Sequence, residues 1–133
     1  MRKTKIVFDT SFLLEAAQNL QDAFEEAERL ADEAAELVLP QPVFSELKSI
    51  SAGKGRQARA AKMSLQLVEA KKGKTVVEKT VARKADDSVR EICLKNLEKS
   101  ERTIVCSNDY DLRKSLKKKA NFLCVKKGRI GWC

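Results

Sequence analysis

Histidine is absent from the 133-residue chain, and this absence excludes more chemistry than any other feature of its composition. Without imidazole the chain cannot form a Ser-His or Cys-His nucleophile system, nor a zinc site with histidine ligands. None of the four cysteines belongs to a CxxC pair, so a zinc ribbon is not indicated either. Any catalysis is therefore expected to depend on carboxylates, a metal ion and water.

Long apolar runs and aromatic residues are also scarce. No apolar segment approaches the roughly 20 residues that span a bilayer, and Asp9 interrupts the apolar stretch near the start, which argues against a signal peptide. Three cysteines lie in apolar contexts typical of core residues in a reducing compartment. We therefore expect a cytoplasmic protein with no membrane partner. Only Tyr110 and Trp132 are candidates for base stacking, so aromatic sequence readout should be slight.

Positive charge is concentrated in one part of the chain. The net charge is +8, but residues 1–47 hold 4 basic and 10 acidic groups, a net −6, whereas residues 48–133 hold 23 basic and 9 acidic groups, a net +14. A basic excess of this kind attracts polyanions such as nucleic acids. A lysine-rich solvated surface, common in heat-adapted proteins, is the alternative. The acidic clusters described below favour nucleic acid.

Short β-branched segments alternate with helical patterns along the chain. Strands are predicted at residues 4–8, 36–40, 75–81, 103–107 and 121–127, and helices from about residue 11, over 21–35, from about 43, and over 57–70, 85–100 and 108–120. Residues 128–133 are predicted to be a tail. This alternation implies an α/β fold, a three-layer α/β/α sandwich with a central, mainly parallel sheet of about five strands. No linker or repeat divides residues 1–133, so we expect a single domain.

Four acidic clusters lie where the predicted strands end or the predicted helices begin. They are Asp9, Glu46, the pair Asp86 and Asp87, and the pair Asp109 and Asp111. Each alone has a simpler explanation, as a helix cap or a partner of a helix dipole. In a parallel sheet, however, the carboxyl ends of strands share one edge, so these carboxylates are expected to meet in one pocket. Crowded carboxylates resist ionisation, and Mg²⁺ or Mn²⁺ relieves their repulsion.

The acidic segments, in this order, resemble the motifs of the PIN-domain nucleases. D-T-S-F-L-L, a Glu within V-F-S-E-L, A-D-D and S-N-D-Y-D-L-R cover nearly the whole chain, and the last two are the most specific. Within the family the chain is most similar to small archaeal PIN proteins. These are similar to ribosomal-RNA-processing PIN nucleases and, more distantly, to VapC-type toxins. The family often has Asn after D-T, where this chain has Ser11, and serine still offers an oxygen and a helix cap.

The resemblance implies a metal-dependent endoribonuclease with Mg²⁺ or Mn²⁺ as cofactor, acting in ribosomal RNA processing. The acidic positions of the family fall on Asp9, Glu46, Asp86 or Asp87, and Asp109 or Asp111, all candidate catalytic residues. The expected metal ligands are Asp9, Asp87 and Asp109, and the expected supporting residues are Thr10, Ser11, Ser107 and Asn108. One or two ions would activate water for phosphodiester hydrolysis.

Two basic segments are expected to contact the RNA backbone. They contribute Lys54, Arg56, Arg59 and Lys62 from the first segment, and Arg113, Lys117 and Lys118 from the second. Further partners to consider are a second copy of the chain, an antitoxin or a ribosome-assembly protein. Two alternatives stay open: a VapC-type toxin ribonuclease, and a non-catalytic RNA-binding PIN module in a larger assembly. A response-regulator receiver is weaker, because no D-x-x-x-P segment is present.

Overall fold

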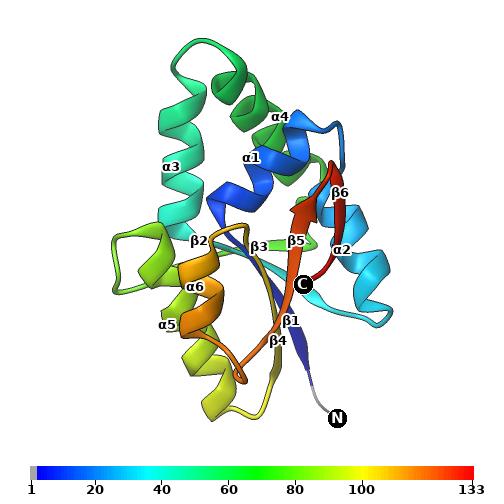
Figure 1. The fold of residues 1–133 in the computed structure, drawn as a ribbon. Helices are drawn as coiled ribbons and strands as arrows, with labels where there is room; N and C mark the ends of the chain where they lie inside the picture. Colours follow the sequence, from blue (N-terminus) through cyan, green and yellow to red (C-terminus); the bar gives the residue numbers. More distant parts are fainter. Residues whose placement is uncertain (1–2) are drawn as a thin grey trace.

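The computed structural model describes residues 3–133, in which a six-stranded sheet is flanked by helices on both faces (Figure 1). The strands are β1 (Thr4–Phe8), β2 (Glu36–Pro40), β3 (Thr75–Glu78), β4 (Arg102–Cys106), β5 (Asn121–Lys126) and β6 (Arg129–Trp132). The helices are α1 (Thr10–Gln18), α2 (Ala23–Ala31), α3 (Gln41–Ser51), α4 (Arg56–Ala70), α5 (Ala85–Glu98) and α6 (Tyr110–Ser115). The expected α/β/α architecture is confirmed, with one strand more than expected.

The order of the strands creates a reversal point at the centre of the sheet. The order is β3-β2-β1-β4-β5-β6, and every neighbouring pair is parallel except β5 and β6. The chain extends from β1 to one side through β2 and β3, and then to the other side through β4 and β5. In open parallel sheets, ligands bind beyond the carboxyl ends of the strands at such a reversal. The residues that follow β1 and β4 therefore lie at the most suitable edge.

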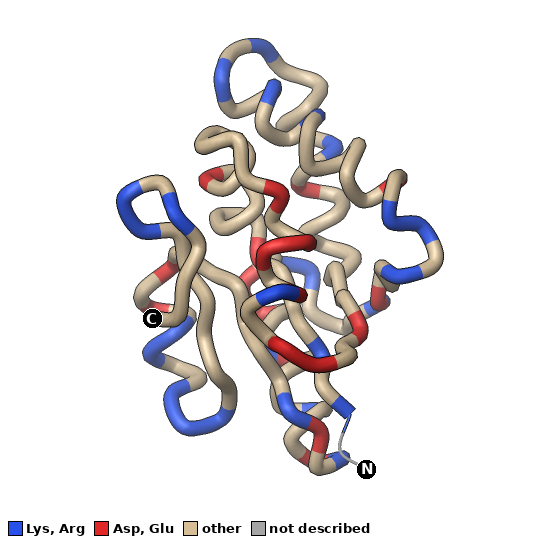
Figure 2. Tube along the Cα trace, turned by 90° about the vertical axis from the view of Figure 1, so that its right-hand side faces the viewer, with Lys and Arg blue, Asp and Glu red and all other residues tan. Residues whose placement is uncertain are grey.

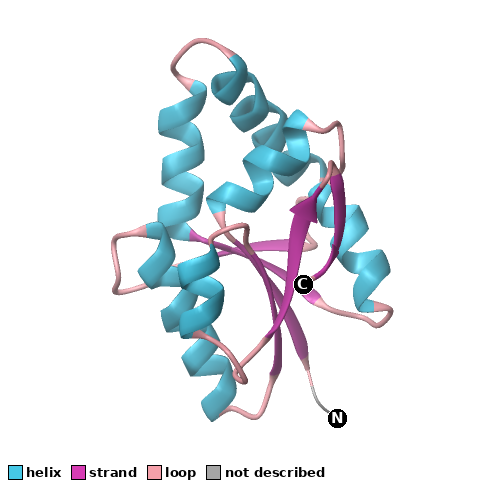
Figure 3. Cartoon of the chain, in the orientation of Figure 1, coloured by secondary structure: helices cyan, strands magenta, loops and turns pink. Residues whose placement is uncertain are grey.

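Alternating side chains of the central strands supply two hydrophobic cores. In β1, Ile6 and Phe8 pack in the core that includes buried residues of α1, α2, α3 and α4, whereas Val7 packs with α5 and α6. Figure 3 shows the corresponding helices on either side of the sheet. Because both faces are covered, the central strands read as continuous apolar runs rather than as alternating polar and apolar residues.

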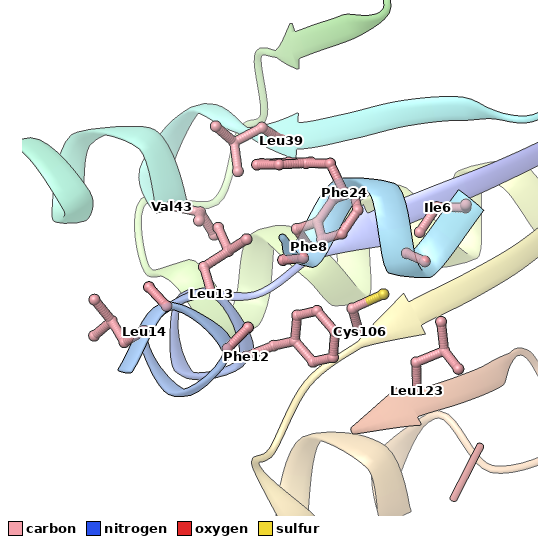
Figure 4. Close-up of a cluster of buried hydrophobic side chains, with 14 of the residues drawn as sticks. Ile6, Phe8, Phe12, Leu13, Leu14, Phe24, Leu39, Val43, Cys106 and Leu123 are labelled. Carbon is pink, nitrogen blue, oxygen red and sulfur yellow. The ribbon is translucent and has the colours of Figure 1, made fainter. Parts of the chain in front are cut away.

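Phe8, the last residue of β1, holds the start of α1 in place. Its ring centroid lies 4.7 Å from that of Phe24 in α2 and 6.2 Å from that of Phe12 in α1 (Figure 4). All three rings are fully buried, and each buried phenylalanine contributes about 1.5–3 kcal/mol. This packing determines where the chain leaves β1, and therefore where the next residue, Asp9, is placed.

The residues expected to be a tail instead form β6, an antiparallel partner of β5. The two strands are joined by a two-residue turn at Lys127 and Gly128, both of which have positive φ. Positive φ at both positions matches the hairpin turn that follows the natural twist of a sheet. The prediction missed this strand because Ile130 is its one buried residue, so no alternating pattern marks it.

Several predicted elements end earlier than expected. Helix α6 ends at Ser115 instead of residue 120, since β5 has to begin at Asn121 to pair with Ile104, and the chain turns back through Lys118 at φ 70°. Helix α2 ends at Ala31, where Asp32 adopts a left-handed conformation, and β3 ends at Glu78. The three cysteines expected in the core, Cys93, Cys106 and Cys124, are buried. Within residues 3–133, no helix has the length and apolar character needed to cross a bilayer.

Candidate active site

Asp9 lies at the reversal point of the sheet, between the ends of β1 and β4. The register that pairs Phe8 with Cys106 brings the two strand ends together, and the backbone N–H of Asp9 donates to the Cys106 carbonyl at 2.9 Å. The Asp9 side chain is 2% exposed. A carboxylate is rarely buried to this degree unless partners stabilise it.

Two serine hydroxyls hold the Asp9 carboxylate. Ser11 Oγ donates to Asp9 Oδ2 at 2.9 Å, and Ser107 Oγ donates to the same oxygen at 2.8 Å. Each serine in turn accepts a backbone N–H from the loop between β4 and α6, Ser11 from Asn108 at 3.1 Å and Ser107 from Asp109 at 3.0 Å. The two hydroxyls therefore tie the loop to Asp9 and leave Asp9 Oδ1 free of side-chain hydrogen bonds within the described chain.

Helix capping does not explain Asp9. Asp9 occupies the N-cap position of α1, but its side chain makes no capping hydrogen bond. Asp109 does cap its helix, because its Oδ1 accepts the Leu112 N–H at 3.1 Å. The simpler explanation by capping thus covers part of the role of Asp109 and does not account for the burial of Asp9.

Three carboxylates from different elements lie near enough to the reversal point for their charges to act on one another. Burial raises the pKa of Asp9, its hydrogen bonds from Ser107 and Ser11 partly offset this, and Asp109 raises it further. The pKa of Asp86, in the first turn of α5, is raised by burial and then by the charges of Asp9 and Asp109, whereas Arg90 lowers it. Asp9, Asp86 and Asp109 are named the acidic cluster below.

The neighbouring residue Asp87 points elsewhere. Its Oδ1 accepts from Arg90 Nη1 at 2.9 Å, and Arg90 Nε donates to Ser115 Oγ of α6 at 2.9 Å. Asp87 thus ties α5 to α6 through Arg90. The sequence could not separate Asp86 from Asp87, and the structure brings Asp86 to the acidic cluster.

The other two candidate acids lie at the margin. Glu46 is exposed on α3 and lines an open hollow of about 580 Å³ together with Asp86 and Asp87. Asp111 is exposed in the first turn of α6, and within residues 3–133 it makes no side-chain hydrogen bond or ion pair. Glu46 therefore shares the hollow with Asp86 of the acidic cluster. Asp111 lies two residues after Asp109, in the helix that Asp109 caps.

The donor set suits a hard divalent cation, although it does not form a complete cage. In the described chain, no three acidic or cysteine side chains converge closely enough to surround an ion. Mg²⁺ usually retains several waters and binds proteins through one or two carboxylates, so a complete cage is not required. The Thr10 hydroxyl, beside Asp9, is buried without a hydrogen-bond partner and is a further oxygen donor at this point.

The first predicted cationic segment lies away from the acidic cluster. Lys54, Arg56, Arg59 and Lys62 are exposed at the start of α4 and in the turn before it. Figure 2 shows this basic turn at one extremity of the molecule. Arg56 and Arg59 lie against Ala17 and Gln18 at the end of α1, whose nine residues span about 13 Å from Asp9.

The second predicted cationic segment lies only partly on helix α6. Arg113 is half-buried in α6, lies 5.9 Å from the Tyr110 ring centroid and contacts Cys133. Lys117 and Lys118 follow the end of the helix, in a turn at the opposite end of α6 from Asp109. The predicted helix over residues 108–120 would have carried all three cations, but α6 ends before these lysines.

Sequence analysis missed two cations that the structure places beside the acids. Arg83 and Lys84 precede α5 and line the same hollow as Glu46 and Asp86. Their position in the sequence, directly before the A-D-D segment, was a usable signal. Arg83 and Lys84 belong to no helix or strand, so no periodic pattern marks them.

These features define the class of the protein: an α/β domain whose acidic site lies at the reversal point of a mainly parallel sheet. A family model described as PIN like domain matches residues 6–128, and the chain belongs to this family. The matched residues include all four acidic clusters. The chain therefore has the fold of PIN domain nucleases.

A comparison with solved structures gives the same fold. The structure of the PIN domain endonuclease Utp24 matches with a TM-score of 0.71 and 20% sequence identity, covering 96% of this chain and 90% of that chain. At this level of identity the likeness concerns the fold. A comparison with curated proteins gives no match.

Proposed function

We propose that this protein is a divalent-metal-dependent endoribonuclease that hydrolyses RNA phosphodiester bonds at the acidic cluster, in the processing of ribosomal RNA. The observation that carries the proposal is the burial of Asp9 at the reversal point of the sheet, within reach of the charges of Asp86 and Asp109. Crowded acids raise the free energy of the folded state unless a cation compensates them. The family and its fold support nuclease chemistry, and the motif resemblance supports the ribosomal RNA role.

The residues of the cluster have distinct proposed roles. Asp9 and Asp109 are the main Mg²⁺ or Mn²⁺ ligands, and Asp86, in place of Asp87, completes the set. Ser11 and Ser107 orient the Asp9 carboxylate through its Oδ2. When bound, the ion supplies charge neutralisation and lowers the pKa of a coordinated water. Glu46, which lines the hollow with Asp86, would act on the metal or substrate through water.

RNA is the proposed partner because the basic half of the chain carries the excess charge. The exposed cations at the start of α4 would hold a part of the strand remote from the cut, since they lie at the far end of α1 from Asp9. A VapC-type toxin would share this chemistry and differ in its partner, which an antitoxin gene adjacent to that of this protein would indicate. A non-catalytic PIN module would bind RNA without cutting it.

The test is cleavage of RNA by the wild type, Asp9→Asn and Asp109→Asn, with Glu98→Gln as an exposed acidic control on α5. Sequencing the 5′ ends of fragments made from total RNA locates the cuts. Both cluster variants should lose cleavage in Mn²⁺ or Mg²⁺ and keep a wild-type circular dichroism spectrum, whereas the control should cut normally. Full activity in both cluster variants would contradict the proposal, and binding without cleavage by the wild type would favour the non-catalytic module.

Metal binding has a readout that does not depend on activity. A ligand that binds the folded state stabilises it, by about 2.7 kcal/mol when present at a hundredfold excess over its Kd. Mn²⁺ should therefore raise the melting temperature of the wild type and of Glu98→Gln. The shift should be largely lost in Asp9→Asn and Asp109→Asn. An equal shift in all four proteins would place the ion elsewhere.

A further inference from the structure

The loop between β3 and α5, residues 79–84, is held by one side chain of α5. The carboxylate of Glu91 accepts the backbone N–H of Val81 at 3.0 Å and 3.1 Å, through its two oxygens, and the N–H of Ala82 at 2.9 Å. The Thr80 hydroxyl donates to the Ala82 carbonyl at 2.7 Å across the same turn. The conformation of the loop is thus determined by polar contacts.

Hydrophobic burial does not account for this ordering. Val81, at the middle of the loop, is 91% exposed. The hydrogen bonds from Ala82 and Val81 lower the pKa of Glu91, which keeps it ionised as an acceptor at neutral pH. Ordering an exposed loop costs conformational entropy, of about 1–2 kcal/mol per residue for the backbone. Such a cost has a use where a ligand is bound, because a preorganised loop loses less entropy on binding.

The loop presents cations to the hollow beside the acidic cluster. Arg83 and Lys84 are exposed and line the same hollow of about 580 Å³ as Glu46, Asp86 and Asp87. Within residues 3–133 neither cation forms an ion pair with these carboxylates, whereas Arg90 is committed to Asp87 and Ser115. The hollow is therefore lined by two cations without an ion pair within residues 3–133 as well as by carboxylates.

We infer that residues 79–84 form a preordered phosphate-binding loop, in which Arg83 and Lys84 contact backbone phosphates of a single-stranded RNA next to the bond that is cut. The inference rests on the proposed function and names the part of the site that grips the substrate. A cluster of carboxylates repels a phosphodiester, so adjacent cations are needed to bring it into the hollow. Glu91 is a positioning residue, which acts through the backbone of Val81 and Ala82.

The test measures binding of a labelled single-stranded RNA of about 12 nucleotides, a length within the site sizes of single-strand-binding proteins. Binding is measured in chelator over a range of salt concentrations, so that cleavage does not interfere. The loop variant is Arg83→Ala/Lys84→Ala. The matched control, Lys74→Ala/Lys99→Ala, removes the same charge at the other ends of β3 and α5, where both lysines are exposed.

Two lost phosphate contacts should lower the slope of log affinity against log salt by roughly 1.4, and affinity near 0.1 M salt by about 10- to 30-fold. The control should retain the wild-type slope. Equal behaviour of the loop variant and the control would overturn the inference. The loop variant should lose affinity for a DNA strand of the same sequence by the same factor, because the contacts are to phosphates. A loss of affinity confined to RNA would overturn the assignment of these contacts to phosphates.

Glu91 gives a second, independent readout. Glu91→Ala removes a negative charge, which by itself would strengthen RNA binding, yet it should weaken binding several-fold because Arg83 and Lys84 are no longer held. Glu91→Gln keeps one acceptor oxygen and should restore part of the affinity. Tighter binding by Glu91→Ala would show that its charge, and not its hold on the loop, is what matters, and would overturn the positioning role.

The two proposals fail in different ways. If the wild type cuts RNA in an Asp9-dependent manner but the loop variant binds normally, the phosphate-binding loop is overturned and the nuclease stands. If no protein cuts RNA but binding depends on Arg83 and Lys84, the nuclease proposal fails and the loop stands only as a phosphate-binding site.

Discussion

At the scale of single residues, the neighbours Asp86 and Asp87 show how much one position on a helix decides. Successive residues of an α-helix point about 100° apart, so adjacent acids face different surroundings. Asp86 meets Asp9 and Asp109, which raise its pKa after the larger effect of burial. Asp87 meets Arg90 instead. Two residues with the same chemistry are therefore expected to contribute unequally.

This difference can be measured with a matched pair of substitutions. Asp86→Asn should reduce metal-dependent cleavage by about 100-fold or more, since even residues one shell outside a metal typically change activity by 10- to 100-fold. Asp87→Asn should stay within about threefold of the wild type, because its exposed ion pair is worth little. Single-turnover rates at saturating Mn²⁺ give the comparison. If Asp87→Asn lost more cleavage than Asp86→Asn, Asp87 would be the metal ligand, as expected from the sequence.

At the scale of elements, Asn108 joins the loop after β4 to β5. Its amide Nδ2 donates to the Val125 carbonyl at 3.1 Å, and its Oδ1 accepts the Val125 N–H at 2.8 Å. The backbone of the same residue donates to Ser11, which holds Asp9. The end of β5 thus supports the acidic cluster through a single side chain, although β5 supplies no acid to it.

Asn108→Ala should therefore cost both stability and activity. It leaves the Val125 N–H and carbonyl without these partners, which should lower the free energy of unfolding by about 1–3 kcal/mol. Cleavage should fall as well, because the loop that orients Asp9 loses its attachment. The control, Asn121→Ala, removes an exposed contact to Arg102 and should change stability by no more than about 0.5 kcal/mol. Urea denaturation measures the stability of both variants. Equal stability of Asn108→Ala and Asn121→Ala would contradict the role of Asn108 in joining the loop to β5.

At the scale of the whole molecule, the acidic cluster links stability to pH. Asp9 and Asp86 have raised pKa values in the folded state, so the folded protein takes up protons before the unfolded chain does. Between neutral pH and the ordinary glutamate value of 4.5, stability should therefore increase as the pH falls and decrease as it rises again. No histidine is present to titrate in this interval. Glu91, whose pKa is lowered, acts in the opposite direction only below its ordinary value of 4.5.

We predict that, in chelator, the melting temperature of the wild type rises as the pH is lowered over this interval. The melting temperature of Asp86→Asn should rise less. The variant lacks one of the two carboxyl groups that bind the extra protons. Thermal melts followed by circular dichroism at several pH values provide the measurement. A wild-type melting temperature that decreases as the pH is lowered, or the same pH dependence in both proteins, would show that the cluster is not the source.

Local sequence determined much of the architecture. The apolar, β-branched segments that form β1 and β4 are typical of strands buried on both faces, because continuous Val, Ile and Phe would otherwise expose apolar side chains to water. The alternation with helices then implied a parallel sheet and one shared edge for the acids. The inference of a parallel sheet is confirmed, because it depends on periodicity, which each segment carries within itself. The shared acidic site stays a prediction.

Tertiary structure alone decided the features that depend on contacts between segments distant in sequence. Helix α6 stops at Ser115 because β5 must reach β4, and no residue inside α6 signals that requirement. The choice of Asp86 over Asp87 depends on which way α5 is rotated against β1 and β4. Likewise, Glu91 meets the backbone of Val81 and Ala82 only after the chain has turned between β3 and α5. Packing determines these directions, and a residue's own identity does not encode where its neighbours will lie.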